Sequence, residues 1–258
     1  MKMHVYEPGG ENSPTVLIIH PMLSSASSMK AALCDHMGPG LRFLVPDLSA
    51  HGDEASAPYV SAASEAAAIH EWLASRGVHR LSLGFAASLG GVILFELLRF
   101  PDLSFDRLFI EGVSFYSGGH VARVGGSILS RVMVAKHRKA VRDPEAGARK
   151  LARLYGEEAA RAMTSSFAAM SEESIRAIMR DCSHVSLPPP LPCHPAAMHL
   201  RIWGERLGPA ARAPRDPAPL SAGRAARLAR LGALRAHEPR RASLRGDAAE
   251  RRPGLGIY

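Results

Sequence analysis

The sequence predicts an α/β protein whose mainly parallel sheet is flanked by helices. Three observations favour this class: short apolar runs typical of buried strands, longer helical patterns between them, and one long helical stretch without strands. We expect strands at Val16–His20, Arg42–Val45, Leu81–Phe85, Leu108–Val113 and Met198–Trp203, and helices at Ser28–Met37, Ser61–Arg76 and Leu89–Phe100. In such sheets the reacting groups gather at the carboxyl ends of the strands.

The first expected strand leads directly into a loop that we expect to take part in the site. Thr15–Ile19 has the apolar pattern of a buried strand, and it runs into the residues His20-Pro21-Met22-Leu23. Pro21 has no backbone N–H and therefore cannot donate one to a ligand, whereas the amide of Met22 remains available.

After the second strand, Asp47, His51 and Gly52 form a short polar loop in the run Pro46-Asp47-Leu48-Ser49-Ala50-His51-Gly52-Asp53. We assign no catalytic role to Asp47 or His51.

The next strand and helix meet in a tight turn at Ser88, which is the most informative feature of the chain. The residues Ala86-Ala87-Ser88-Leu89-Gly90 match the pattern G-x-S-x-G with alanine in the first position, and Gly91 follows. A serine on such a turn is held in a strained conformation that exposes its hydroxyl, and the following helix directs its N-terminal N–H groups toward it. We therefore interpret Ser88 as a nucleophile. The alternative is a serine that only caps the helix.

The chain between His120 and Val185 is predicted to be wholly helical. Asp143 followed by Pro144 has the pattern of an N-cap and a first-turn proline, and Ser171 precedes two glutamates at another helix start. The last expected strand then ends in Trp203-Gly204-Glu205.

The His20 loop and the Ser88 turn together resemble the α/β-hydrolase family, whose first core loop reads His-Gly-x and whose nucleophile turn follows downstream. The resemblance implies that Ser88 is the nucleophile and that the amides of Met22 and Leu89 form the oxyanion hole. It makes His20 a loop brace. The Asp47–Asp53 loop is similar to the family's Asp-x-x-Gly-x-Gly loop, and this resemblance implies that Asp47 and His51 brace loops. The helical stretch resembles the cap of many members, although a plain pair of packed helices remains the alternative.

In that family an acid and then a histidine follow the cap and complete the catalytic triad. Leu207 stands where the resemblance expects the aspartate, so Asp216 is the candidate acid, with Glu111 as an alternative after an earlier strand. The candidate base is His237, which is the only later histidine. Because the histidine expected near the end of the chain is missing, we predict weak or absent turnover.

The chain divides by composition and charge. Residues 206–258 carry 12 Arg and four acidic residues, which supplies the whole net charge of +8, and Arg, Ala, Pro, Gly and Leu fill 44 of these 53 positions. This composition is typical of a disordered basic tail or of a GC-rich message translated in a displaced frame. We expect a hydrolase core at 1–118 and 188–205, a helical cap at 119–187, and an atypical tail at 206–258.

The remaining expectations concern partners and location. The three cysteines, the absence of a signal-peptide pattern and the absence of a long apolar run predict a cytoplasmic protein without a membrane segment. We expect a small ester-like substrate, no cofactor, no metal and no nucleic acid, and the sequence leaves the oligomeric state open. The Cys and His residues at 182–184 and 193–194 are poorly spaced for zinc, and the glycines at 84–91 do not fit a nucleotide loop. The second functional hypothesis is a hydrolase-like binding protein without catalysis.

Overall fold

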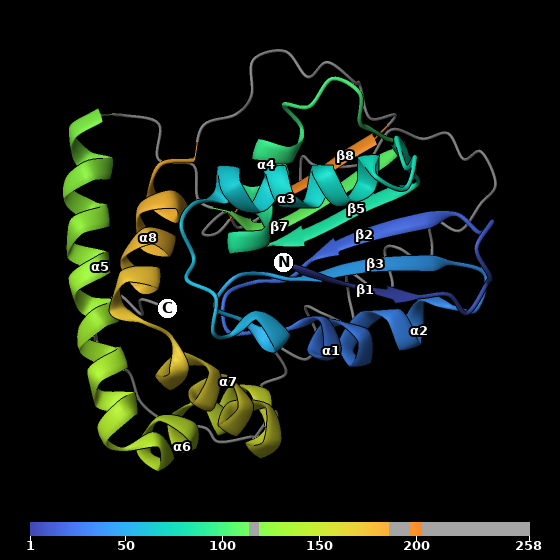
Figure 1. Ribbon diagram of the computed structural model, residues 1–258. Helices are drawn as coiled ribbons and strands as arrows, with labels where there is room; N and C mark the ends of the chain where they lie inside the picture. The colour runs from blue at the N-terminus through green and yellow to red at the C-terminus, as the bar shows by residue number, and fades with distance from the viewer. Residues whose placement is uncertain (114–118, 186–196, 203–258) are drawn as a thin grey trace, which may run out of the picture.

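The computed structural model describes residues 1–113, 119–185 and 197–202, and its centre is a six-stranded sheet (Figure 1). The strand order is β1-β3-β2-β5-β7-β8, in which β1 runs antiparallel to β3 and all other pairs are parallel. The strands are β1 (Lys2–Tyr6), β2 (Thr15–Ile19), β3 (Arg42–Asp47), β5 (Leu83–Ala87), β7 (Arg107–Val113) and β8 (Ala197–Ile202). The predicted parallel α/β architecture is confirmed.

Helices cover both faces of this sheet. Alternate residues of its central strands are therefore buried on opposite sides. Leu17 and Ile19 of β2 belong to the large core formed with α3 (Ala62–Ala74) and α4 (Leu89–Leu97). Val16 and Ile18 point to a smaller core under α1 (Ala26–Met29), the π-helix η1 (Lys30–Cys34) and α2 (Asp35–Met37). The strand β2 is thus buried on both faces, which is why it reads as a continuous apolar run.

Four consecutive helices lie between β7 and β8 in the sequence: α5 (Gly119–Arg142), α6 (Pro144–Tyr155), α7 (Glu157–Ala169) and α8 (Glu172–Ser183). They stand on the side toward which the arrowheads of β2 and β5 point (Figure 1), and α8 contacts α4. The predicted helix starts are confirmed, since the side chains of Asp143 and Ser171 accept hydrogen bonds from the first turns of α6 and α8.

A buried network attaches α8 to the segment that precedes α3. The Asp181 carboxylate accepts hydrogen bonds from the Tyr59 hydroxyl at 3.0 Å and from the Ala62 amide at 2.7 Å. The Tyr59 amide in turn donates to the Ser174 hydroxyl at 3.0 Å. Burial raises the pKa of Tyr59, so its hydroxyl stays a donor. These bonds fix the helical segment to the sheet domain at a defined position.

Three local details differ from the sequence prediction. The expected strand Leu81–Phe85 is divided, because Arg80–Leu81 forms β4 and pairs with β6 (Ser104–Phe105) in a separate two-stranded sheet. The expected helix Ser28–Met37 contains the π-helical turn at its centre. The edge strand β1 was not predicted, because its half-exposed residues form no continuous apolar run.

None of the described helices combines the length and apolar character needed to cross a membrane.

Candidate active site

Ser88 occupies the tight turn between β5 and α4, and its backbone has a conformation that non-glycine residues rarely adopt. Its backbone angles are φ 49° and ψ −115°, and it is one of three non-glycine residues with positive φ in the described chain. Its amide donates to the Glu111 carbonyl on β7 at 2.8 Å, which fixes the turn to the neighbouring strand. The Ser88 side chain makes no capping hydrogen bond to α4. Ser88 is thus the N-cap residue of α4 by position, but its hydroxyl does not make the capping bond that the alternative interpretation requires.

Gly90 and Gly91 let α4 begin directly against the sheet. A Cβ atom on Gly90 would lie 2.7 Å from the carbonyl carbon of Ile19 and 2.8 Å from the carbonyl oxygen of His20. A Cβ atom on Gly91 would collide with the Val113 side chain. Since backbone atoms cannot move aside as a side chain can, glycine is required at residue 90, and the serine turn lies beside the loop that follows β2.

That loop carries the second predicted backbone donor. The Pro21 carbonyl accepts hydrogen bonds from the Ser24 amide at 3.3 Å and from the His20 ring, which folds the loop into a turn, and Leu23 has φ 66°. Within the described residues, neither the Met22 amide nor the Leu89 amide donates to another group. Leu89 is the first residue of α4 and has no intrahelical partner for its N–H. Two free amides thus belong to the two segments that meet at Gly90.

His20 is a buried neutral brace, as predicted. Its Nδ1 donates to the Pro21 carbonyl at 2.8 Å, and its Nε2 accepts from the Leu48 amide at 3.2 Å. Burial and the neighbouring His51 ring, at a centroid distance of 5.1 Å, lower the pKa of His20 to about 3. Because both ring nitrogens are used and the ring resists protonation, His20 is poorly suited to proton transfer.

His51 is also buried, and burial lowers its pKa. Its Nδ1 donates to the Ser49 carbonyl at 2.9 Å, which confirms the predicted bracing role. Its Nε2 has no hydrogen-bond partner in the described part of the chain. The ring therefore packs against His20 as a neutral group and holds the loop through its bond to Ser49.

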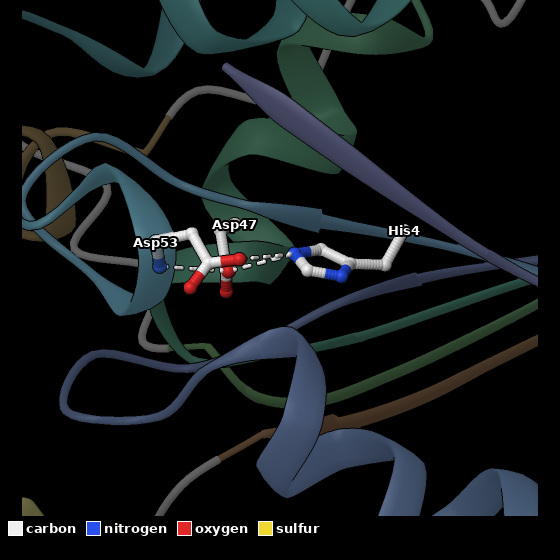
Figure 2. Close-up of side chains that lie close together, drawn as sticks. All are labelled: His4, Asp47 and Asp53. Atoms are coloured by element: carbon white, nitrogen blue, oxygen red, sulfur yellow. Dashed lines mark hydrogen bonds and ion pairs between the residues drawn. The ribbon is translucent and has the colours of Figure 1, made fainter.

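Asp47 holds three segments together through one buried carboxylate (Figure 2). Oδ1 accepts from the Ala26 amide at 2.7 Å, while Oδ2 accepts from the Asp53 amide and from the His4 ring, each at 2.9 Å. Gly52 has φ 50°, and a Cβ there would collide with this carboxylate. The structural role predicted for Asp47 is confirmed. Sequence reasoning missed His4, because it lies on the unpredicted strand β1.

The side-chain atoms of His4, Asp47 and Asp53 that could bind a metal ion lie within 4.8 Å of one another. The hydrogen bonds argue against one. Both oxygens of Asp47 already accept N–H groups, and the Asp53 carboxylate binds the Lys2 ammonium at 2.6 Å. A divalent cation would have to displace these donors, so the cluster is better explained as a loop brace.

The structure does not describe the predicted acid and base. Asp216, His237 and Leu207 lie outside the described residues, as does the Trp203–Glu205 segment. Glu111, the alternative acid, lies half-buried on β7, where its backbone carbonyl receives the Ser88 amide. The described structure therefore brings together Ser88, Leu89 and the Met22 loop, and it leaves the proton-transfer groups as predictions.

Two apolar residues at the end of α7, Phe167 and Met170, are buried in the large core. Of the two zinc-like pairs considered in the sequence, Cys182 is a partly buried free thiol, and His184 Nδ1 donates to the Arg180 carbonyl at 2.9 Å. The other pair, at 193–194, lies outside the described residues.

The described residues form a mainly parallel sheet with helices on both faces, and Ser88 lies in a strained turn between β5 and α4. Solved structures with a similar fold include an alpha/beta hydrolase family protein from Desulfitobacterium hafniense, with a TM-score of 0.50, 15% identity, and coverage of 71% of this chain and 72% of that one. A thermophilic esterase from Thermogutta terrifontis gives a TM-score of 0.52 at 16% identity, with 71% and 67% covered. MenH from S. aureus gives 0.52 at 14% identity, with 72% of each chain covered.

This chain therefore has the α/β-hydrolase fold. No family model matches the sequence. No curated protein matches it either.

Proposed function

We propose that this protein is a serine hydrolase that acts on a small carboxylic ester through an acyl-enzyme. Ser88 Oγ attacks the carbonyl carbon, the C–O bond to the alcohol breaks, and the alcohol leaves with a proton. Water then cleaves the acyl–serine ester and regenerates the hydroxyl. The observation that carries the proposal is the backbone of Ser88, at φ 49° and ψ −115°, together with a side chain that is not spent on capping α4.

A strained backbone is maintained only where the surrounding structure holds it, and such strain gathers at active sites. Here the hydrogen bond from the Ser88 amide to the Glu111 carbonyl on β7 and the close approach of Gly90 to Ile19 hold the turn. A serine that served only for packing or capping would have no need of this conformation. The geometry thus favours display of a reactive hydroxyl.

We assign the oxyanion hole to the amides of Met22 and Leu89. When the ester carbonyl is attacked, its oxygen becomes negative and needs N–H donors that are already oriented. Both amides are free within the described residues, and the α4 dipole adds positive potential at Leu89. Removing one such donor typically lowers kcat by about a hundredfold to a thousandfold.

We assign the acid to Asp216 and the base to His237, with α5–α8 as a cap that encloses the substrate. The base stands outside the family's expected position in the sequence, and loss of a catalytic base lowers kcat by about a million-fold. We therefore propose impaired turnover for this chain. In keeping with its composition, we place the protein in the cytoplasm, with a small-molecule substrate and no cofactor.

Labelling with a fluorophosphonate probe tests the nucleophile. Stoichiometric phosphonylation of Ser88, located by peptide mass spectrometry and absent in Ser88→Ala, would support the proposal. Hydrolysis of p-nitrophenyl acetate by the wild type and by His237→Ala measures turnover separately. Normal esterase rates that persist in His237→Ala would show that the assignment of the base is wrong.

The second candidate is a binding protein that retains the fold without catalysis. The observation that favours it is the placement of His20 and His51, which are both buried in bracing roles. An intact, folded protein whose Ser88 does not react with the fluorophosphonate probe would support this candidate and exclude the hydrolase.

A further inference from the structure

Charge is unevenly distributed among the segments of the described chain. Residues 1–113 carry seven Lys and Arg and 12 Asp and Glu, whereas residues 119–155, which form α5 and α6, carry nine Lys and Arg and only two acidic residues. The sheet domain is therefore acidic and the α5–α6 pair strongly basic. Such a concentration of basic residues produces a local positive potential that attracts anions.

Within the basic part, four arginines line one groove between α5 and α8. This arginine groove has a volume of about 480 Å³, and its lining residues are Ser130, Arg131, Val134, Ala135, Arg138, Arg142 and Arg176. Three of the arginines share one side of α5, because residues 131, 138 and 142 are separated by seven and four positions. The fourth comes from α8, so the groove depends on the packing of the two helices.

One carboxylate holds two of these guanidinium groups in place. Glu172 accepts from Arg138 Nε at 2.7 Å and Nη2 at 3.0 Å, and from Arg176 Nη2 at 2.6 Å. The hydrogen bond from Arg138 is the main reason why the pKa of Glu172 falls to about 2, so the carboxylate stays charged. It fixes the geometry of the two arginines but neutralises only one of the four positive charges.

The other two arginines keep their charge for a ligand. Arg142 Nε donates to the Arg138 carbonyl at 3.2 Å, a contact that orients the side chain without neutralising it. Arg131 forms no ion pair within the described chain. The groove therefore presents about three uncompensated positive charges on arginines, which bind phosphate oxygens through paired N–H groups.

Within the described residues, Glu172 is the carboxylate paired with the groove arginines, and the remaining segments carry few acidic residues. Residues 114–118 and 186–196 contain no acidic residue, and residues 203–258 carry 12 Arg against five acidic residues. The groove is thus suited to an anion from outside the chain. We propose that the arginine groove binds the phosphoryl group of a phosphorylated ligand, a property that does not depend on catalysis by Ser88.

Inorganic pyrophosphate is the probe for this site. In isothermal titration calorimetry of the full chain at low ionic strength, we expect one pyrophosphate per protein, weakened at least about tenfold in the double variant Arg131→Gln/Arg142→Gln. The matched control Arg149→Gln/Arg153→Gln removes two charges from α6 and should bind as the wild type does. Ser88→Ala should also bind normally, so failure of the proposed hydrolase activity would leave this result unaffected.

A second arm identifies the source of the phosphate. Val124 and Ile128 are more than half exposed on the same side of α5 as Arg131. If the ligand is a lipid headgroup, vesicles containing phosphatidic acid should bind, and Val124→Ser/Ile128→Ser should weaken vesicle binding while pyrophosphate binding is kept. Pyrophosphate binding without vesicle binding indicates a soluble phosphorylated ligand.

Two results would overturn the proposal. The first is the absence of binding by pyrophosphate and by vesicles at millimolar phosphate. The second is equal weakening in the groove variant and in the α6 control, since that would show a general attraction to a basic surface without a site. Circular dichroism of each variant verifies that the helices remain folded.

Discussion

The amide of Ser88 donates a 2.8 Å hydrogen bond to the carbonyl oxygen of Glu111, and this bond joins the strained turn to the adjacent strand β7. The bond continues the pairing of β5 with β7, in which Ala87 lies opposite Glu111. The turn is therefore held by the sheet itself. Its strain is offset by contacts that extend over two strands, and this has consequences for stability.

We predict that Ser88→Gly makes the fold more stable. Glycine adopts φ 49° and ψ −115° without steric cost, so relief of strain should exceed the entropy that glycine loses on folding, for a net gain of about 1 kcal/mol. Ser88→Ala keeps a Cβ and should differ little from the wild type. Urea unfolding compares the two, and a Ser88→Gly protein less stable than Ser88→Ala would contradict the strain argument.

The contact of α4 with β2 predicts a large cost for Gly90→Ala. The new Cβ would lie 2.7 Å from the Ile19 carbonyl carbon, and backbone on both sides prevents relaxation, so we expect a loss of about 3 kcal/mol. Gly125→Ala is the control, because no atom lies within 4 Å of its Cβ position on α5. It should gain up to about 1 kcal/mol in helix propensity. Equal effects of the two changes would refute the close approach.

The buried histidines predict that stability decreases in mild acid. The pKa of His20 is lowered to about 3 from its usual 6.5, and that of His51 is also lowered, so the unfolded chain binds more protons than the folded chain below pH 6.5. The free energy of unfolding should therefore fall as pH falls from 6.5 toward 3, by up to about 1.4 kcal/mol per pH unit for each ring. Above pH 6.5 this dependence disappears.

Urea midpoints at pH 7.5, 6.0 and 5.0 measure that dependence. His20→Asn removes one of the two groups, so its stability should decrease less steeply with acid than that of the wild type, even though the variant is less stable at pH 7.5. A wild-type curve that is flat from pH 7.5 to 5.0 would be inconsistent with neutral buried rings.

The triple role of Asp47 predicts that Asp47→Asn is costly. The new amide nitrogen would face one of the three N–H donors that now meet carboxylate oxygens, so a buried donor would lose its partner. We expect the free energy of unfolding to fall by about 2–3 kcal/mol. Asp53→Asn keeps the backbone amide that donates to Asp47 and loses only the ion pairs of an exposed carboxylate with Lys2 and His4, so its effect should be much smaller. Thermal unfolding distinguishes them, and similar Tm values would disprove the brace.

His137 on α5 predicts a stabilising substitution. The ring is buried edge-on against Phe167, and neither nitrogen has a partner within the described residues. His137→Phe removes an unsatisfied polar group and keeps the aromatic contact, so we expect a gain of about 1 kcal/mol. The exposed His36→Phe should show no such gain. A lower Tm for His137→Phe would indicate that the ring has a role beyond packing.

Local pattern was sufficient for much of the fold. The apolar run at Thr15–Ile19 and the turn at Ser88 identify the central strands and the serine, because burial on both faces leaves a continuous signal and a strained turn admits few residue types. The N-caps at Asp143 and Ser171 were readable for a similar reason, since a cap acts within one helical turn.

Other features depend on residues that are distant in the sequence. The edge strand β1 acquires its identity by pairing with β3, and His4 becomes a partner of Asp47 only through that pairing. The arginine groove likewise requires α8 to bring Arg176 beside α5.

The amino-acid sequence by itself determined the α/β class, the strained turn at Ser88 and the helical segment, because these follow from hydrophobic period and from turn chemistry between near neighbours. Only the tertiary structure decided which polar side chains share a carboxylate, why glycine is needed at residue 90, and where four arginines converge. Such arrangements arise from packing between distant segments, and no short stretch of sequence carries a record of them.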